Sequence, residues 1–539
     1  MAKPKLGGKE TTAFEESVTL GGQHRSGDGA RQVVGDRMQG RLPHVNQGDL
    51  PDTRLVFMFR EGPKSQSGRS QSTHRSEEVL ETGWSKGVQE GEYARLRANE
   101  GKPATVSKET KQAGEAKSHR WEWVERSIWT ERMLEALENG VKGGIWFSLI
   151  DKVYRPDTLK RAWQRVKANG GSAGSDHQSI KGFERHDEEN LEKLRQELQE
   201  GTYRPRPIRR EYIPKAGSRE KRPLGIPAVR DRVVQTAVQM VIEPIFERAF
   251  LEYSFGFRPG RGCKDALREV DLLLKAGYTW VLDADIKAYF DSIDHDLLME
   301  ELRTYIGDGR ILRLIEMFLK QEITEALKRW EPEAGTPQGA VISPLLANVY
   351  LHPVDGAMER AGYRMIRYAD DFVIMCRSKE EAERAREAVQ RLIEARGLSL
   401  HEGKTQVVDA TMPGGFDFLG YHFERTMRWP RKKSLKKFKD TIRQKTKRCN
   451  GRSMERVIAS INRTIRGWFE YFKHSHRTTF TPLDGWIRRR LRSILRKRKK
   501  LSGISRGRDH QRWPNSYFRD LGLFNLEEAH RDLLQSLKG

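Results

Sequence analysis

Two adjacent aspartates, Asp370 and Asp371, interrupt an apolar stretch in the sequence RYADDFVIMC at residues 367–376. The flanking runs RMIRY and FVIMC have the length and composition of strands, which predicts a β-hairpin with the aspartates at its tip. Neighbours within one strand face opposite sides, so a hairpin tip lets both carboxylates reach a solvent-filled cleft. Carboxylates held this close repel each other, and a bound divalent cation removes that cost. Because the ligands are oxygens alone, Mg²⁺ or Mn²⁺ is favoured over zinc.

A third carboxylate is available at Asp285, which follows an apolar strand pattern in VLDADIKAYFDSID at residues 281–294. The backbone carbonyl of Ile286 would complete a coordination shell. With Asp370 and Asp371, these groups predict a centre for two Mg²⁺ ions, which lie about 3.5–4 Å apart in two-metal sites. Such a centre activates an attacking 3′-hydroxyl and stabilises a leaving pyrophosphate, so the pattern predicts nucleotidyl transfer. Taken singly, the same aspartates are better explained as surface-turn residues and a strand-end cap.

The charge of the chain indicates a polyanionic partner. Its 539 residues predict three or more domains, and they carry a formal net charge of +24 with a pI of about 9.8. Residues 428–500 hold 26 Lys and Arg against 4 Asp and Glu, which is +22 of that total. A short charge run usually marks a solvated face, but a block this long and one-sided favours contact with nucleic acid.

Several function classes are disfavoured by what the sequence lacks. No run of eighteen apolar residues appears and the first residues resemble no secretory signal, so we expect no membrane partner. The cysteines, Cys263, Cys376 and Cys449, are too far apart for a disulfide framework or a CxxC zinc pair. We therefore expect a reducing, bacterial-type cytoplasmic location.

The periodicity of apolar residues changes along the chain. Residues 1–115 are poor in periodic apolar residues and are expected to be largely disordered or loosely attached. Order is expected to begin with helical spacing at Trp121–Leu137. The following elements are expected: helices split at Pro156 and ended by Gly170-Gly171, a β-hairpin over 210–227, a helix over 230–250, strands in 278–286 and 364–376, an amphipathic helix in 380–397, a strand in 415–423, and basic helices after 430.

Eight ordered blocks make the chain from about 145 to 500 resemble a group II intron-encoded reverse transcriptase with maturase activity. The blocks are NGGSAGSD (169–176), IPKAGSREKRPLGIP (213–227), FLEYSFGFRPGRGCKDAL (250–267), LDADIKAYFDSID (282–294), GTPQGAVISPLLANVYLHPVD (335–355), RYADDFVIM (367–375), HEGKT (401–405) and GFDFLGYHF (415–423). The resemblance implies an α+β right-hand polymerase with fingers, a palm built on an antiparallel sheet, and a helical thumb and maturase domain.

On this resemblance the chain divides into five parts. They are the extension 1–115, N-terminal helices and fingers 116–275, the palm with its aspartates 276–427, the basic thumb and maturase domain 428–500, and a C-terminal appendage 501–539 with a possible DNA-binding role. Many relatives carry a C-terminal nuclease module with paired cysteines and histidines. This chain has no CxxC, so cleavage of a second DNA strand is not expected.

The resemblance also assigns roles to single residues. Asp285, Ile286, Asp370 and Asp371 fall on the metal-binding and catalytic positions. The nucleotide-binding positions are Lys215 and Arg222 on the fingers hairpin, Phe290 against the sugar 2′ position, Gln338 and Gly339 in the pocket, and Lys404 near the phosphates. The hairpin is one residue longer than the usual form, so Lys221 competes with Arg222. Arg258 and Arg261 fall on a template-contacting segment, and Phe418, Leu419 and Gly420 on the primer-grip turn.

The implied function is RNA-directed DNA polymerisation combined with binding of group II intron RNA, assisting its splicing and mobility. The implied partners are intron RNA, an RNA template, a DNA primer or target, and deoxynucleoside triphosphates. Two other functions remain open: an RNA-binding maturase with a vestigial polymerase, and a reverse transcriptase outside introns that serves phage defence or CRISPR adaptation.

Overall fold

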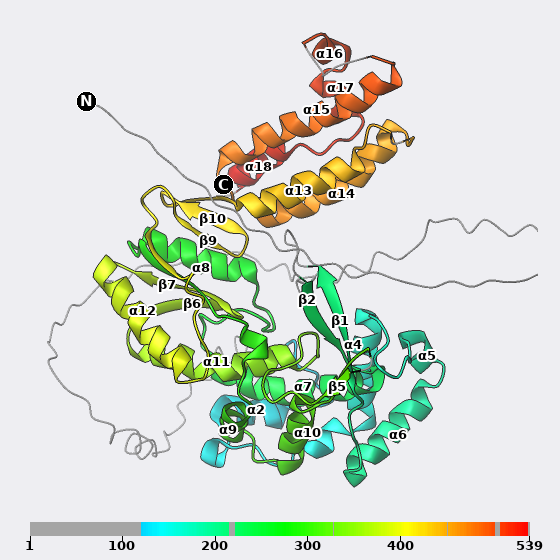
Figure 1. Cartoon of the computed structure of the whole chain (residues 1–539), viewed down its shortest axis with the longest axis vertical. Helices are drawn as coiled ribbons and strands as arrows, with labels where there is room; N and C mark the ends of the chain where they lie inside the picture. Colours follow the sequence, from blue (N-terminus) through cyan, green and yellow to red (C-terminus); the bar gives the residue numbers. More distant parts are fainter. Residues whose placement is uncertain (1–119, 215–220, 327, 450, 502–506, 537–539) are drawn as a thin grey trace, which may run out of the picture. The chain divides into compact units, whose positions relative to one another are not determined.

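The computed structural model describes residues 120–214, 221–326, 328–449, 451–501 and 507–536 (Figure 1). The extension expected for residues 1–115 lies outside the described residues. Helices and antiparallel strands are mixed along the chain, which confirms the α+β class. Among the described helices, none has the length and apolar character needed to cross a lipid bilayer.

The first described residues pack as expected, but through turns as well as a helix. Trp121, Ile128 and Trp129 are buried, yet residues 121–128 form turns and the helix α2 covers only Glu131–Asn139. The single helix predicted over Trp121–Leu137 is therefore wrong in its first half. Contacts between aromatic rings hold this segment in place of a helix. The Trp129 ring packs edge-on against Trp146, with 5.3 Å between the ring centroids.

The helices that follow cover the fingers region. They are η1 Lys142–Gly144, α3 Ile150–Val153, α4 Pro156–Asn169, α5 Ile180–Glu184, α6 Asp187–Glu200 and α7 Val229–Ala249. The predicted break is confirmed, because α4 begins at Pro156, where a missing N–H costs nothing, and is capped by Gly170. Most side chains of α7 are buried, as expected for a central helix packed against α4 and its neighbours.

The fingers sheet has the strand order β2-β1-β4-β5. Its strands are β1 Ile208–Pro214, β2 Lys221–Ile226, β4 Ile323–Glu325 and β5 Lys328–Trp330. The β1–β2 hairpin confirms the prediction for residues 210–227, and β4 joins β1 in parallel through Ile208 and Ile323. The strands β4 and β5 are only three residues long, which is too short for a periodicity of two to reveal them.

The palm sheet has the order β6-β7-β3-β8, with antiparallel pairing throughout. Its strands are β3 Trp280–Asp285, β6 Arg364–Tyr368, β7 Asp371–Cys376 and β8 Gln406–Asp409. One face carries Leu282, Phe372 and Ile374 into a core with the helices α11 Ser343–Arg360 and α12 Lys379–Glu394. The other face carries Val281 and Val373 against α8 Cys263–Lys275. Both faces are thus anchored by apolar burial.

A second small sheet follows the palm, in the order β11-β10-β9. Its strands are β9 Phe416–Phe418, β10 Tyr421–Glu424 and β11 Met427–Pro430. The single strand predicted over residues 415–423 is wrong, because Leu419 and Gly420 take φ of 46° and 84° and reverse the chain between two strands. Such left-handed backbone is typical of tight hairpin turns.

The C-terminal region is helical, as predicted, and shares one core. Its helices are α13 Lys432–Lys445, α14 Met454–Phe472, η3 Arg477–Thr479, α15 Phe480–Arg498, α16 Gly507–Arg512, α17 Asn515–Asp520 and α18 Leu526–Ser536. Trp513, Phe518 and Leu526 pack in the same core as α14 and α15. The boundary expected at residue 500 therefore does not divide two cores, because residues 507–536 complete the thumb bundle.

Three elements connect the fingers and the palm: η2 Tyr289–Asp291, α9 His295–Arg303 and α10 Gly309–Leu319. Asp308 joins α10 to the N-terminal helices. Its carboxylate accepts backbone hydrogen bonds from Leu149 and Ile150 at 2.7 and 2.8 Å, and from Arg310 and Ile311 at 3.0 and 3.3 Å. This buried side chain thus satisfies amides from two segments far apart in sequence.

We expect Asp308→Ala to lower stability by about 2–4 kcal/mol, because it leaves four backbone amides without their acceptor. The matched control is Asp294→Ala, which removes an exposed cap bonded to the Leu297 amide alone and costs about 1 kcal/mol. Urea unfolding followed by tryptophan fluorescence measures both. Equal shifts for the two variants would show that the Asp308 link carries no special stability.

Candidate active site

The structure brings the three predicted carboxylates together at one end of the palm sheet. Asp285 ends β3 directly opposite Asp371 at the start of β7, so their side chains share one face. Asp370 lies in the two-residue turn between β6 and β7, where Ala369 takes a φ of 61°. The predicted hairpin at residues 367–376 is therefore confirmed.

Burial and mutual repulsion make these carboxylates costly to ionise. Burial, with the charges of Asp283, Asp370 and Asp285, raises the pKa of Asp371 to about 7. Burial also raises the pKa of Asp370, and the Asp285 charge adds to it. Asp283 is a further acidic residue of this site that the sequence patterns did not single out. It lies two positions before Asp285 on the same face of β3, and burial raises its pKa to about 6. Its spacing of two in LDADI was the signal that could have found it.

The donor set fits a divalent metal such as Mg²⁺ in chemistry and charge. All the predicted ligand atoms are oxygens, and burial raises the pKa of Asp370 and Asp371, so a bound cation would favour their ionised forms. Within the described residues, no three acidic, histidine or cysteine side chains are already arranged as a metal cage. Lys404 explains part of this, because its ammonium pairs with the Asp285 carboxylate. Ile286 has a buried side chain and bridges to Leu400, and its carbonyl's role stays a prediction.

A buried arginine holds the hairpin turn in place. Arg367 on β6 is 1% exposed and binds both carboxylate oxygens of Asp355 on α11, at 2.7 and 2.5 Å. Its remaining nitrogen donates to the Asn348 side chain at 2.9 Å and to the Ala369 carbonyl at 3.0 Å. The last bond reaches the turn that carries Asp370, so the planar guanidinium fixes the turn to the helix below it.

A glycine lets the chain cross directly behind this turn. The Asn348 amide also donates to the Gly256 carbonyl at 2.7 Å, and Phe255 donates to the Arg367 carbonyl at 2.9 Å. A Cβ at Gly256 would lie 2.3 Å from the Ala369 nitrogen, which no side chain could occupy. The segment around Gly256 therefore has to be free of a side chain at this point.

The predicted nucleotide-binding residues lie on separate segments of the chain, and backbone hydrogen bonds connect these segments. The amide of Thr336 donates to the Phe290 carbonyl, and the amide of Gly225 donates to the Gln338 carbonyl, each at 2.7 Å. Gly339 has a φ of 112°, and a Cβ there would lie 2.6 Å from the Gly225 carbonyl oxygen. The close approach predicted for Gly339 is thus made to the fingers strand β2. Phe290 is half-buried and edge-on to Phe257, with centroids 6.3 Å apart.

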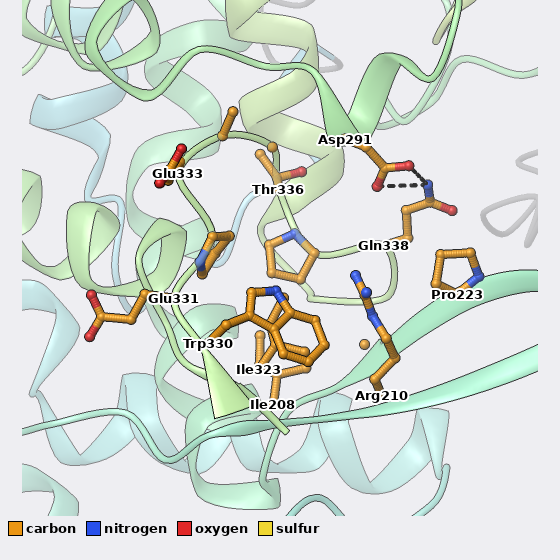
Figure 2. A pocket seen from close by; sticks show the side chains of 15 residues that line it. Ile208, Arg210, Pro223, Asp291, Ile323, Trp330, Glu331, Glu333, Thr336 and Gln338 are labelled. Carbon is orange, nitrogen blue, oxygen red and sulfur yellow. Dashed lines mark hydrogen bonds between the residues drawn. The ribbon is translucent and has the colours of Figure 1, made fainter. Parts of the chain in front are cut away.

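A cavity of about 530 Å³ opens beside Gln338, between the fingers sheet and the loop 331–338. Figure 2 shows the Trp330 ring lying over Ile323 and Ile208, with Arg210 beside it. The Arg210 guanidinium is 5.0 Å from the Trp330 ring centroid. The Gln338 amide nitrogen lies 3.3 and 3.2 Å from the Asp291 carboxylate oxygens, as the dashed lines in Figure 2 mark. This bond orients the Gln338 side chain.

The fingers cations are only partly described. Lys215 lies outside the described residues. Arg222 is exposed on β2, and its charge acts to lower the pKa of Asp370. Lys221 is also exposed, opposite Pro214 at the end of the hairpin. The electrostatic link to Asp370 favours Arg222 over Lys221 as the cation nearest the carboxylates.

The template-contact prediction is wrong for Arg258. Its side chain is 2% exposed, binds Glu247 through two nitrogens at 2.9 and 2.6 Å, and donates to the Leu251 and Ser254 carbonyls. These bonds from Arg258 therefore fix its own loop to α7. Arg261 keeps 29% of its side chain exposed and donates to the Glu252 carbonyl at 2.6 Å, so its template role stays a prediction.

The predicted primer-grip turn faces the thumb helices. Phe418 is fully buried, whereas the Leu419 carbonyl accepts from the Tyr471 hydroxyl at 2.7 Å. The Gly420 carbonyl accepts from the Arg431 amide at 2.9 Å. These bonds connect the turn with α13 and α14, and contact with a primer stays a prediction.

Two family models match the chain. Residues 213–423 match the family described as reverse transcriptase (RNA-dependent DNA polymerase), and residues 435–513 match the maturase-specific domain of group II introns. The first match contains all three predicted catalytic aspartates. The second covers most of the basic helical region.

Individual proteins show the same likeness. The chain is 32% identical over 334 residues to the group II intron-encoded protein LtrA of Lactococcus lactis, covering 50% of this chain and 55% of LtrA. It is 38% identical over 275 residues to protein YkfC of Escherichia coli, covering 44% and 71%. The partial Cas6-RT-Cas1--Cas2 complex is 26% identical over 46% of this chain and 41% of that chain, with a TM-score of 0.31.

We expect Arg367→Met to lower stability by about 3–5 kcal/mol, because the Asp355 carboxylate would remain buried without its partner. The turn carrying Asp370 would also lose its tether. The matched control is Arg386→Met, which removes an exposed ion pair with Glu383 worth about 0–1 kcal/mol. Thermal unfolding of both variants measures the difference. An Arg367→Met protein as stable as the control would contradict the proposed tether.

Proposed function

Because the chain belongs to the family of group II intron-encoded reverse transcriptases, we propose that it is an RNA-directed DNA polymerase that also binds intron RNA and assists its splicing and mobility. The observation that carries the polymerase is the convergence of Asp285, Asp370 and Asp371 at one end of the palm sheet. The aligned part of the chain covers 55% of the length of LtrA. The activity and partners proposed for this chain are therefore argued from the residues of this chain.

The carboxylates supply the metal-dependent part of the reaction. When bound there, two Mg²⁺ ions would lower the pKa of the primer 3′-hydroxyl and neutralise charge on the leaving pyrophosphate. Asp285, Asp370 and Asp371 would hold them, and Asp283 adds negative charge beside the site. Lys404 is paired with Asp285, and its ammonium would be available to a phosphate if that pair opened.

Other residues of the chain bind and select the nucleotide. Arg222 and Lys215 act on the triphosphate from the fingers hairpin. Phe290 closes the space next to the sugar, so a 2′-hydroxyl collides with its ring. Gln338, oriented by Asp291, lines the pocket, and Gly339 keeps the neighbouring backbone packed against the Gly225 carbonyl. Arg261 contacts the template, and the turn Phe418–Gly420 supports the primer end.

The helical C-terminal region supports the second activity. It carries +22 of the formal charge and matches the maturase-specific domain. Its aromatic residues Trp468, Phe469 and Phe480 pack with one another in the core, which leaves Arg and Lys for RNA phosphates. In splicing the RNA itself would be the catalyst, and these cations would offset the phosphate repulsion in its folded form. Assistance to RNA splicing agrees with the expected cytoplasmic location.

The alternatives predict different behaviour. A maturase with a vestigial polymerase is disfavoured by the intact set of Asp285, Asp370, Asp371 and Gln338. A reverse transcriptase that serves CRISPR adaptation or phage defence is disfavoured by the match to the intron maturase domain. RNA copurified with the protein, when sequenced, identifies intron RNA on our proposal and unrelated RNA on the second alternative.

We expect Asp370→Asn to lower primer extension on an RNA template by at least about a hundredfold, because it removes a charge that stabilises the transition state. Asp409→Asn is the matched control, since Asp409 lies on β8 opposite Trp280, at the other end of β3 from Asp285. Binding of RNA should be unchanged in both variants. Absence of extension by the unmodified protein, with RNA binding intact, would favour the maturase alone.

We expect Phe290→Ala to reduce discrimination against ribonucleotides by about tenfold or more, because the ring no longer meets the 2′-hydroxyl. The measurement is the ratio of kcat/KM for insertion of a deoxynucleotide and the matching ribonucleotide. Phe147→Ala, which removes a ring that is 63% exposed, serves as control. If Phe290→Ala keeps the original ratio, the ring packs in the palm without selecting the sugar.

A further inference from the structure

A second cavity lies in the C-terminal helical region and is lined by cationic and imidazole side chains. It measures about 310 Å³, which is room for roughly ten water molecules. Its lining consists of Arg428, Lys473, His474, Ser475, His476, Arg477, His530, Leu533 and Leu534. None of the described residues that line it carries a carboxylate.

Three elements far apart in sequence build the walls. Arg428 on β11 donates to the His474 carbonyl at 3.0 Å, and the His476 amide donates to the Arg428 carbonyl at 2.8 Å. These bonds hold the loop 473–477 against the strand. The third wall is α18, whose His530 ring lies 4.6 Å from the Phe480 ring. Asp484 accepts the first amides of α18 at 3.1 and 3.0 Å, which fixes that helix on α15.

The cavity offers positive charge that its neighbours only partly neutralise. Arg428 pairs with Asp271 at 2.7 Å, and Lys473 pairs with Glu470 at 2.7 Å. Arg477 has no ion-pair partner among the described residues. Ser475 is 2% exposed, and its hydroxyl makes no hydrogen bond of standard geometry in the described part of the chain, although it lies close enough to the Tyr421 hydroxyl to act on the pKa of that group. A buried hydroxyl without a hydrogen bond of standard geometry, beside a free guanidinium, is what an anionic ligand would satisfy.

We propose that this cavity binds a phosphodiester of structured nucleic acid, held by Arg477 and Ser475 and by His474 and His530 in their protonated forms. This inference rests on the proposed RNA-binding function, and it makes α18 one wall of an RNA-binding site. The site lies in the most basic part of the chain, so a nucleic-acid backbone is the anion that its surroundings favour. Leu533 and Leu534 give the same cavity an apolar edge suited to a ribose.

The histidines make binding depend on pH. Burial and the charges of Arg428, Lys473 and Lys264 lower the pKa of His474, with Glu470 acting in the opposite direction. Burial and His476 lower the pKa of His530. Both rings are therefore largely neutral at pH 7 in the free protein, and a phosphate favours their charged forms. Binding then takes up protons, so affinity rises as pH falls.

The test uses the full chain and an RNA stem-loop carrying a pH-insensitive rhodamine dye, with anisotropy read at constant ionic strength. We expect binding about fivefold tighter at pH 6 than at pH 8. The double variant His474→Gln/His530→Gln should lose this dependence, and the control His510→Gln, an exposed histidine on α16, should keep it. A double variant with the original pH dependence, or an unmodified protein without any, would overturn the proposal.

Two further measurements complete the test. Arg477→Gln should weaken binding about threefold at both pH values and reduce the salt slope by about one phosphate contact, whereas Arg386→Gln should change neither. If a DNA stem-loop gives the same pH response, the cavity recognises the phosphodiester backbone without the 2′-hydroxyl. If only the RNA stem-loop gives the response, the cavity recognises the 2′-hydroxyl as well. Primer extension on a short template reports on the polymerase separately, so it should be unchanged in these variants.

Discussion

The burial of several carboxylates that also repel one another is the constraint around which the palm is built. Asp283, Asp285, Asp370 and Asp371 lie at the same end of one sheet, partly withdrawn from water, and each raises the cost of charging another. Such an arrangement persists only if the surrounding fold is stable enough to hold it. Two apolar cores, one on each face of the palm sheet, and the buried pair between Arg367 and Asp355 provide that stability.

The same constraint explains the cations nearby. Lys404 pairs with Asp285, and Arg222 and Arg431 act on the carboxylates from the fingers hairpin and the start of the thumb. All three have exposed or partly exposed side chains, so they can leave the carboxylates and meet a phosphate at little cost. Arg367 and Arg258, in contrast, are buried, fully bonded and structural. Burial thus separates the cations that remain accessible to a ligand from the arginines that hold the scaffold.

The C-terminal region shows how one helical core can carry two kinds of surface. Its aromatic and aliphatic residues face inward and bind α13 to α18 into a single bundle. Most of its cations remain outside, although Arg492 is 1% exposed, and at one place they line a cavity with three histidines. Residues beyond position 500, which looked like an appendage, complete this bundle and supply one wall of the cavity. Nucleic-acid contact in this region is therefore shaped by a packed core.

Much of this protein could be predicted from the sequence by itself, because local patterns carry the information. The hairpin at Asp370-Asp371, the long helix after Val229 and the basic helices follow from spacing of apolar residues, and the convergence of the candidate aspartates follows from their strand flanks. The buried role of Arg258, the tether at Arg367, the turn at Leu419-Gly420 and the contribution of Asp283 were decided only by the tertiary structure. In each case the partner lies on another element or in a turn, and hydrogen bonding and burial between such elements leave no periodic signal in the chain.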